Sequence, residues 1–244
     1  MKVLLTGKNL HEIEPLLESH QMELVDNDPE LIICHGGDGA LLGAERDYPG
    51  VPKFPIRDSE TAPVCERHSC AKRLESLFSN QAKQTELIKL TGTVRDKKLI
   101  SINDIFLHNR ERVSALRYRV WIDDELYARE IVGDGVGMAT PHGSTAYYRS
   151  ITHSIFRVGL GLAFSNSTEV VNHLVLPDNS IIRIRILRGP AIMVGDNSPQ
   201  YISLEEGDEA VIRKSPDKAI ILGLDDFMCR HCRQLRHKDK YKVL

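Results

Sequence analysis

The sequence predicts two parts of different fold class, an N-terminal α/β domain with a mainly parallel sheet and a C-terminal β-rich, sandwich-like domain. Over about the first 80 residues, short apolar runs alternate with segments of helical spacing, which is typical of strand-helix units around a parallel sheet. Beyond them, apolar residues alternate in short runs between turn signals, which is typical of packed antiparallel sheets. A length of 244 residues with 41% hydrophobic content suits two modest domains.

The α/β domain is predicted over residues 1–82. We expect strands at 2–6, 22–26 and 31–35, and helices at 9–20 and 70–77. Residues 51–56, VPKFPI, read as a short strand whose prolines place it at a sheet edge or in a loop. Residues 218–224, KAIILGL, can return as a strand to this first layer, so the segment of about 218–244 is expected to complete the domain.

The β-rich domain is predicted over residues 83–217. Its expected strands lie at 85–94, 98–109, 115–123, 125–132, 173–187, 191–196 and 209–215. A glycine-rich segment at 133–150 stands among them. We find no internal repeat and no low-complexity linker in the sequence.

Charge and hydropathy exclude several classes of function. A formal net charge of -2 and a pI near 6.6 give no global field that would attract nucleic acid or an anionic membrane, so any affinity for phosphate must be local. No run of eighteen apolar residues occurs, and the N-terminal stretch turns polar after five residues, too soon for a signal peptide. We expect a cytoplasmic, soluble protein, and we interpret the basic tail at 230–242 as a solvated end rather than a polyanion site.

The cysteines allow two interpretations. Five cysteines, an odd number, fit free thiols in a reducing compartment, which is the favoured interpretation. The alternative is a structural zinc site in which two pairs supply four thiolates, with His68 and His231 nearby. The four candidate ligands are Cys65, Cys70, Cys229 and Cys232. Only the second pair has the usual knuckle spacing.

Residues 29–44, PELIICHGGDGALLGA, place a lone carboxylate, Asp38, among three glycines where a strand becomes a helix. The backbone N–H groups of Gly36, Gly37 and Gly39 and the helix N-terminus can bind phosphate. A carboxylate beside bound phosphates repels them unless it holds a metal or accepts a proton from an attacking hydroxyl. Asp38 is therefore predicted to be catalytic. The alternative is a turn in which Asp38 caps the following helix.

A second segment, GDGVGMATPHGSTAYYRS at 133–150, combines glycines with small hydroxylated residues. Small residues let a loop lie against a planar ligand, while hydroxyls and backbone amides can bond an adenine edge or a ribose. The alternative is a tight strand-loop-helix connection in which Ser144 caps a short helix and Tyr147 is a core residue.

Three segments taken together resemble the NAD kinase family. They are GGDG at 36–39, ND at 103–104 and DGVGMATPHGSTAY at 134–147, in that order. The third matches every fixed position of the family pattern D-G-x-x-x-x-T-P-x-G-S-T-A-Y and is the most specific. Weaker likeness continues at 173–186 and 204–212, so the resemblance covers most of residues 30–215.

The resemblance implies an α/β domain and a β-sandwich-like domain with NAD held between them, in a homo-oligomer, either a dimer or a tetramer. The implied reaction transfers a phosphoryl group from ATP or polyphosphate to the 2′-hydroxyl of the adenosine ribose of NAD, with a divalent metal, expected to be Mg²⁺, giving NADP. Asp38 matches the catalytic acid. The implied NAD contacts are Asp38, Gly39, Asn103, Asp104, Asp134, Thr145, Ala146, Tyr147 and Ser150. Asp196 corresponds less securely to a family acid near the ligand.

The sequence also departs from the family pattern. Ala40 stands where the family has threonine, FPIRDSETAP at 54–63 replaces a turn with glycine and asparagine, and Val132 stands at a commonly basic position. Asp104 replaces a glutamate. An active NAD kinase is favoured because the acid is retained. Two alternatives stay open, a non-catalytic regulator that binds NAD or another adenine nucleotide, and a kinase for another acceptor such as a different adenosine compound or a lipid.

Overall fold

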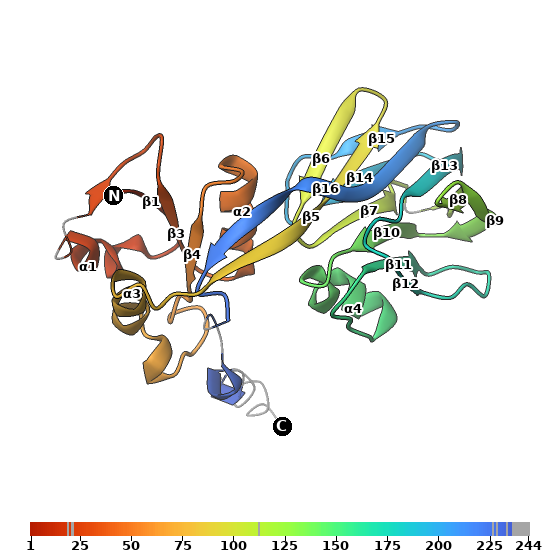
Figure 1. Ribbon diagram of the computed structural model, residues 1–244. Helices are drawn as coiled ribbons and strands as arrows, with labels where there is room; N and C mark the ends of the chain where they lie inside the picture. Colours follow the sequence, from red (N-terminus) through yellow and green to blue (C-terminus); the bar gives the residue numbers. More distant parts are fainter. Residues whose placement is uncertain are drawn as a thin grey trace. The chain divides into compact units, whose positions relative to one another are not determined.

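The computed structural model contains two compact units (Figure 1). It describes residues 1–18, 20, 22–111, 113–225, 227, 229–232 and 234–235. One unit comprises Met1–Leu87 and Ala219–Leu244, and the other comprises Ile88–Lys218. The chain passes from the first unit to the second within strand β5 (Gln84–Val94) and returns within strand β16 (Glu209–Leu222).

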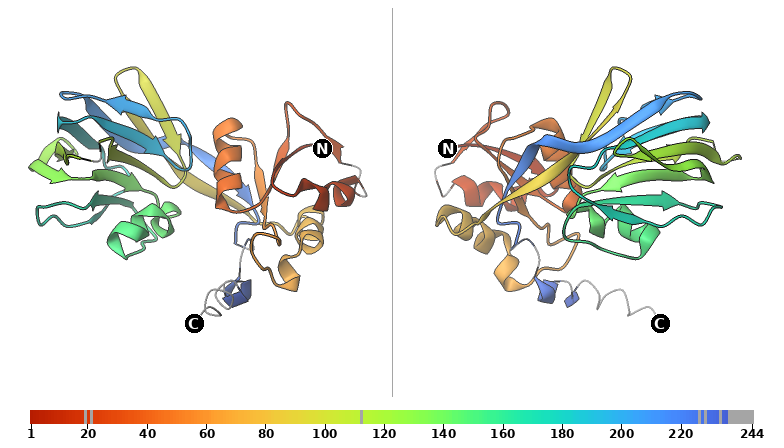
Figure 2. Two further views of the ribbon diagram at one scale, coloured as in Figure 1. Left: turned by 180° about the vertical axis from the view of Figure 1, so that it is seen from behind. Right: turned by 45° about the vertical axis from the view of Figure 1, so that its right-hand side comes forward.

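The first unit is an α/β layer with a parallel sheet. Its elements in chain order are β1 (Lys2–Gly7), η1 (Leu10–Glu12), α1 (Glu14–Glu18), β2 (Glu23–Leu24), β3 (Leu31–His35), α2 (Asp38–Asp47), β4 (Lys53–Ile56), η2 (Glu66–His68) and α3 (Cys70–Phe78). The strands follow the order β2-β1-β3-β4-β16, and these four pairings are parallel. Figure 2 shows α1, α2 and α3 packed around this sheet. The prediction of a mainly parallel sheet is confirmed, and Ile221 of the returning segment pairs with Lys53.

Strand β4 lies inside the sheet, so the expectation that its prolines place it at an edge is wrong. It pairs with β3 along its length but with β16 only at Lys53. The Pro55 carbonyl accepts a hydrogen bond from Arg73 of α3, at 3.4 Å, instead of from a strand. Because no neighbouring strand needs an N–H group from Pro55, a proline is compatible with this internal position.

The second unit consists of two antiparallel sheets. Its remaining elements are β6 (Lys97–Ser101), β7 (Asp104–Asn109), β8 (Leu116–Ile122), β9 (Glu125–Gly133), β10 (Gly135–Ala139), η3 (Gly143–Thr145), α4 (Tyr147–Thr152), β11 (Leu160–Ser165), β12 (Leu174–Leu176), β13 (Ile182–Arg188), β14 (Ala191–Gly195) and β15 (Ile202–Leu204). One sheet has the order β16-β13-β8-β9, with β5 and β6 attached to β16 through β5. The other has the order β12-β11-β10-β7-β14-β15.

Two of the long strands expected from the sequence are each divided between the two sheets. The run at 98–109 forms β6 in one sheet and β7 in the other, and the run at 173–187 forms β12 and β13. Polar or turn residues interrupt the apolar runs at 103–104 and 177–180, but such an interruption does not show that the chain crosses to the other sheet. The turns at Asn103 and at Pro177 make the change of sheet.

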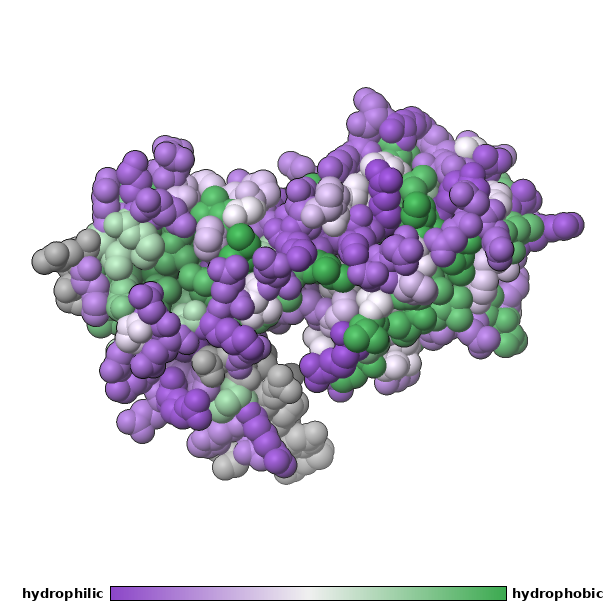
Figure 3. Space-filling model, viewed as in Figure 1, coloured by the Kyte–Doolittle hydropathy of each residue, from purple (hydrophilic) through white to green (hydrophobic). Residues whose placement is uncertain are grey.

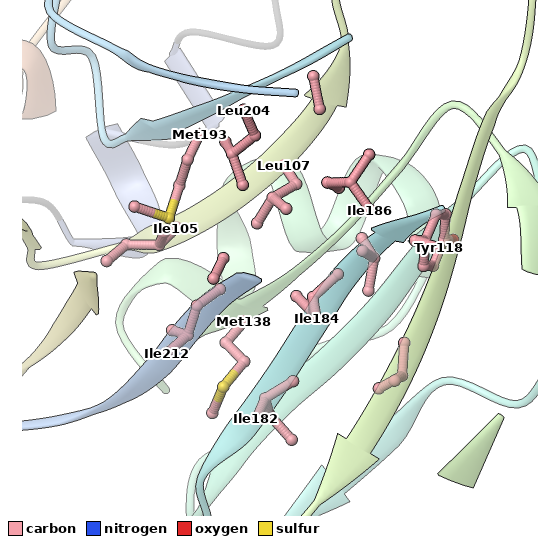
Figure 4. Close-up of a cluster of buried hydrophobic side chains, with 14 of the residues drawn as sticks. Ile105, Leu107, Tyr118, Met138, Ile182, Ile184, Ile186, Met193, Leu204 and Ile212 are labelled. Atoms are coloured by element: carbon pink, nitrogen blue, oxygen red, sulfur yellow. The ribbon is translucent and has the colours of Figure 1, made fainter. Parts of the chain in front are cut away.

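The core of the second unit lies between its two sheets (Figure 4). Side chains from β7, β10 and β14 face side chains from β8, β13 and β16 across a dry interior. The labelled residues are Ile105, Leu107, Tyr118, Met138, Ile182, Ile184, Ile186, Met193, Leu204 and Ile212. Burial of these apolar side chains is the main stabilising term for such a sandwich. The sandwich-like prediction is confirmed.

On the face drawn in Figure 3, hydrophilic side chains predominate and hydrophobic ones form smaller patches between them. Within the described part of the chain, no helix combines the length and the apolar character needed to cross a membrane. The basic tail expected as a solvated end lies partly outside the described residues, at 233 and from 236 onward.

Candidate active site

The glycine turn joins a buried strand to a helix. All five residues of β3 are buried, and α2 begins three residues after the strand ends. Gly36 has a φ of +148°, a conformation that side chains disfavour, and its N–H donates to the Ile56 carbonyl at 2.8 Å. Gly37 precedes the helix and no side chain caps it. The start of α2 therefore offers a helix N-terminus without a side-chain cap, an arrangement that binds anions.

Asp38 presents its carboxylate to solvent at the start of α2. Its side chain is 64% exposed, and Oδ1 accepts a hydrogen bond from Arg57 Nη2 at 3.2 Å. The alternative in which Asp38 caps the helix is wrong, because the capping position belongs to Gly37 and the carboxylate pairs with an arginine instead. An exposed carboxylate at a helix N-terminus can accept a proton or bind a metal.

Arg57 is the residue at this turn that sequence reasoning missed. It follows β4 directly, is 8% exposed, and its guanidinium lies 4.3 Å from the centre of the Phe227 ring. A Cβ added at Gly37 would lie 3.5 Å from Arg57 Nη1, so the cation stands beside the glycine turn. The signal was present in the sequence, because Arg57 is the first charged residue of the segment that departs from the family pattern. Arg57 thus places a positive charge beside the glycine turn.

A turn at Asn103 joins β6 to β7 in the second unit and is held by Asp196. The Asp196 carboxylate accepts from the N–H groups of Ile102 and Asn103, at 2.8 and 2.7 Å, and from the Ser101 hydroxyl. These bonds engage the carboxylate in shaping the turn. Asp196, which the resemblance places near the ligand, thus holds the backbone of Asn103 in this structure.

Asp104 is a buried acid at the start of β7. It is 8% exposed, and no described residue donates a hydrogen bond to its carboxylate. Burial, together with the nearby charge of Asp196, raises the pKa of Asp104 to about 7. A buried carboxylate that has no internal donor is suited to accept a hydrogen bond from a hydroxyl of a bound ligand.

The loop after β10 packs directly on this turn. The Thr140 N–H donates to the Asn103 carbonyl at 2.8 Å, and the Thr140 hydroxyl donates to the Ile102 carbonyl at 2.7 Å. A Cβ at Gly143 would lie 2.0 Å from the Asn103 oxygen, so only glycine allows this approach. The structure therefore brings together ND and TPHG, which are far apart in the sequence.

The two tyrosines after this loop have different environments. Tyr147 is 37% exposed, and its ring packs edge-on against Phe106 at 4.9 Å. Tyr148 is buried and packs against Phe156 at 5.0 Å. The alternative that made Tyr147 a core residue is wrong, since Tyr148 takes that place. Tyr147 offers an accessible aromatic ring for a planar ligand.

Ser144 holds the loop from within rather than capping a helix. It is buried, and its hydroxyl lies 2.8 Å from the Pro141 carbonyl and 3.0 Å from the Phe156 carbonyl. No side-chain bond caps α4, which follows Ala146. Thr145 and Ala146 are exposed where η3 leads into α4. The loop thus presents these two residues to solvent on a buried, hydrogen-bonded base.

A cavity of about 520 Å³ opens beside this loop. Tyr147 and Ser150 line it on one side and Asn166 on another. The Asn166 amide donates to the Asp134 carboxylate at 2.8 Å, so the exposed Asp134 borders the cavity through Asn166. The volume falls within the range of small-molecule sites. Two of the expected contact residues, Tyr147 and Ser150, thus line one cavity, and a third, Asp134, is hydrogen-bonded to a lining residue.

The candidate zinc ligands are brought together only in part. Cys65, Cys229 and Cys232 lie in one cluster, and the fourth member is His68. Cys70 lies elsewhere, with its sulfur 3.7 Å from His35 Nε2 and 3.8 Å from a Glu12 oxygen. Counting cysteines alone therefore selected the wrong fourth ligand.

Comparison with known proteins identifies the family of this chain. The family model described as "ATP-NAD kinase C-terminal domain" matches residues 102–223. The chain belongs to the NAD kinase family. An NAD kinase from Clostridium botulinum is 28% identical over 232 residues, covering 88% of this chain and 76% of the relative. One from Enterococcus faecalis is 27% identical over 221 residues, covering 81% of this chain and 75% of the relative.

Solved structures of the family share the fold. A yeast NADH kinase in complex with NADH aligns with a TM-score of 0.75 at 19% identity, covering all of this chain and 88% of that one. An NAD kinase from Archaeoglobus fulgidus in complex with ATP aligns with a TM-score of 0.73 at 18% identity, covering 98% of this chain and 99% of that one. The two-part architecture of this NAD kinase family member is thus the family's architecture.

Proposed function

We propose that the protein transfers a phosphoryl group from ATP or polyphosphate to the 2′-hydroxyl of the adenosine ribose of NAD, giving NADP. The observation that carries this proposal is the family match over 102–223, whose segments ND and TPHG lie in direct contact. Family membership supports the reaction, and the geometry of each unit supports the roles of individual residues.

Asp38 is the proposed catalytic residue. Phosphoryl transfer asks little covalent chemistry of the protein and depends on positioning and on charge. An exposed carboxylate at the glycine turn can orient the attacking hydroxyl and accept its proton. The turn at Gly36, Gly37 and Gly39, with the helix N-terminus, is proposed to bind phosphate oxygens; the Gly36 N–H already donates to the Ile56 carbonyl, so Gly36 would give backbone space rather than a donor.

The second unit is proposed to bind the nucleoside. Asn103 and the buried Asp104 offer an amide and a carboxylate to the ribose hydroxyls. Thr145, Ala146, Tyr147 and Ser150 are proposed to contact the adenine side, and Asp134 the nicotinamide amide. In support, Tyr147 is accessible and lines a cavity of suitable size.

A divalent metal, Mg²⁺, is proposed as the cofactor. Mg²⁺ typically binds one or two carboxylates together with substrate phosphates. The exposed Asp38 carboxylate, with only Oδ1 engaged by Arg57, fits this ligand set. When bound, the ion neutralises charge on the transferring phosphoryl group.

A non-catalytic regulator that binds NAD is the second candidate, and one observation favours it. The Arg57 guanidinium donates to Asp38 Oδ1 at 3.2 Å, so one oxygen of the proposed catalytic carboxylate is already engaged. Ala40 and the altered segment at 54–63 add to this candidate. A kinase acting on another acceptor has no comparable support in the geometry.

The deciding experiment measures NADP formation from NAD and Mg²⁺ with either ATP or polyphosphate as donor, read by an NADP-specific dehydrogenase, alongside calorimetric titration of NAD. We expect turnover with at least one donor. Saturable NAD binding without NADP from either donor would contradict the kinase and leave the regulator. Turnover with only one of the two donors would identify the donor.

Assembly and location are proposed from the resemblance. We expect a cytoplasmic homo-oligomer, a dimer or a tetramer, that acts on small molecules and has no nucleic-acid or membrane partner. Light scattering coupled to gel filtration measures the assembly, and a monomer at working concentration would contradict this part of the proposal.

A further inference from the structure

Three sulfur atoms and one imidazole nitrogen converge in the first unit, away from the glycine turn. The sulfurs of Cys65, Cys229 and Cys232 are separated by 3.6, 3.7 and 3.8 Å, and so form a nearly equilateral triangle. The Nδ1 atom of His68 lies 3.0 Å from the Cys65 sulfur. The four ligand atoms all lie within 4.8 Å of one another.

The three sulfur-to-sulfur separations are those of a tetrahedral metal site. With Zn–S bonds of about 2.3 Å, tetrahedral geometry places neighbouring sulfurs about 3.8 Å apart. A disulfide would instead bring one pair to about 2.05 Å and leave the third sulfur outside. We propose that Cys65, His68, Cys229 and Cys232 bind one Zn²⁺ ion.

The local sequence explains how the ligands meet. The chain spacings are Cys65-x-x-His68 and Cys229-x-x-Cys232, two knuckle-type pairs from distant parts of the sequence. Helix η2 brings the first pair together, since the His68 N–H donates to the Cys65 carbonyl at 2.8 Å. The Cys65 N–H donates to the Cys232 sulfur at 3.3 Å, which joins the two pairs. Such outer hydrogen bonds orient metal ligands.

The ligand set selects the metal. Thiolates with one imidazole favour zinc over the hard cations Mg²⁺ and Ca²⁺, which take oxygen ligands. Four protein ligands complete a tetrahedron and leave no position for water, so the site is structural rather than catalytic. Cys232 and His68 are buried, which shields such a site from solvent.

The zinc would fix the segment that covers Arg57. Phe227 lies two residues before Cys229, is 7% exposed, and its ring lies 4.3 Å from the Arg57 guanidinium. Arg57 in turn donates to Asp38 at 3.2 Å. Binding Cys229 and Cys232 to Cys65 and His68 therefore holds Phe227 over the arginine that pairs with the exposed acid. The proposed metal therefore affects Asp38 only indirectly, by fixing the positions of Phe227 and Arg57.

The test uses the full-length protein, purified without added chelator. Elemental analysis of the wild type is expected to give one zinc per chain, and Cys232→Ser is expected to reduce it to near zero. Cys70→Ser is the matched control, a cysteine of the same unit outside the cluster, and it should keep its zinc. Wild-type protein without zinc, or equal loss in Cys70→Ser, would overturn the proposal.

Cobalt substitution keeps the proposal testable even if Cys232→Ser fails to fold. Wild-type protein loaded with Co²⁺ should show the intense visible bands of tetrahedral coordination and a thiolate-to-metal charge-transfer band. The His68→Cys variant should retain the metal and strengthen the charge-transfer band by about one third, since the ligands change from three thiolates to four. Weak octahedral bands, or a Cys229–Cys232 disulfide found by mass spectrometry in protein without metal, would refute the site.

Discussion

The glycine turn of the first unit (residues 36–39) and the loop after β10 in the second unit (residues 140–146) are held in place by different physical means. At the glycine turn, an exposed carboxylate is held by one ion pair with Arg57 at the surface. At the loop, Thr140 and Ser144 are buried and bond backbone carbonyls, and Gly143 touches the Asn103 backbone. An ion pair therefore positions the carboxylate in the first region, whereas close packing and buried hydrogen bonds position the backbone in the second.

The difference shows what a motif encodes in each region. In the loop, several motif residues shape the backbone, so the segment carries its own scaffold and its sequence pattern is long. At the turn, the motif supplies only the glycines and the acid, and the scaffold comes from residues outside it, Arg57 and Phe227. Substitutions at the turn should therefore change the reaction rate and leave stability unchanged. Substitutions in the loop should lower ligand affinity and stability together.

The largest expected effect is on turnover, in Asp38→Asn. Removing a general base typically costs about 10²- to 10⁴-fold in rate. Because the side chain is exposed and its ion pair contributes less than about 1 kcal/mol, unfolding should be almost unchanged. Steady-state NADP formation measures the turnover, and urea unfolding measures the stability. Asp47→Asn, at the other end of α2, is the control and should keep full activity; a variant at position 38 with near wild-type turnover would remove Asp38 from the chemistry.

The second effect is a pH dependence of stability from Asp104. Its pKa is about 7 in the folded protein against an ordinary 3.8, so the folded state retains a proton that the unfolded chain releases. The contribution to stability is fully present below about pH 4 and is lost as the pH rises through 7, by at most about 4 kcal/mol.

Urea unfolding between pH 4 and 8 measures this dependence. Relative to Asp104→Asn, which cannot ionise, the wild type should lose stability as the pH rises across this window. The exposed Asp124 provides the control, since Asp124→Asn should follow the wild-type profile. Parallel profiles for the wild type and Asp104→Asn would show that the carboxylate is not destabilised by burial.

The sequence predicted the two fold classes and singled out the loop after β10 because both depend on local pattern. Period-2 alternation located most strands, and the pattern from Asp134 to Tyr147 located the loop. It could not predict that residues 98–109 change sheets, because the polar residues at 103–104 mark a turn but not the sheet to which the next strand belongs. Nor could it place Pro55 inside a sheet, since its carbonyl partner, Arg73, comes from a helix later in the chain.

The candidate site shows the same division. Asp38 and Asn103 lie in short motifs that sequence can find. Arg57 acquires its place through Phe227, 170 residues away, and His68 joins the cysteine cluster through a turn of 3-10 helix. The contact of Arg57 with Phe227 has no signature in local spacing, whereas the C-x-x-H spacing of Cys65 and His68 is a local signal that counting cysteines alone overlooks. Counting cysteines therefore included Cys70, which lies outside the cluster, and left out His68, which lies in it.

A smaller effect is expected from Gly143→Ala. The added Cβ would lie 2.0 Å from the Asn103 oxygen, so the loop must shift from the turn. Overpacking of this kind costs about 1 to 3 kcal/mol. We expect lower stability in urea together with weaker NAD binding by calorimetry.

Gly43→Ala is the matched control for this substitution. It lies inside α2, where its Cβ meets only the flexible end of Arg46 at 3.5 Å, so it should stabilise the helix by up to about 1 kcal/mol. Should Gly143→Ala unfold like the wild type and bind NAD as tightly, the loop would not depend on its contact with Asn103.

The smallest expected effect is that of Phe227→Leu, and it tests whether Arg57 serves the phosphate side of the reaction. Leucine keeps apolar bulk but removes the ring that covers the guanidinium, which costs about 0.5 to 1 kcal/mol. If Arg57 attracts donor phosphates, its looser placement should raise KM for the donor several-fold and leave KM for NAD unchanged. The same variant should leave zinc content unaltered, because Phe227 is not a ligand.

Phe54→Leu separates this role from a general loss of packing. Phe54 lies under another arginine of the same unit, Arg73, at 4.7 Å, so the substitution removes the same kind of contact at a distance from the acid. Phe54→Leu should lower stability and leave KM for the donor unchanged. Equal changes of donor KM in both variants would mean that packing alone tunes the turn. A change confined to Phe227→Leu would place the Arg57 charge among the determinants of donor binding, although no motif contains it.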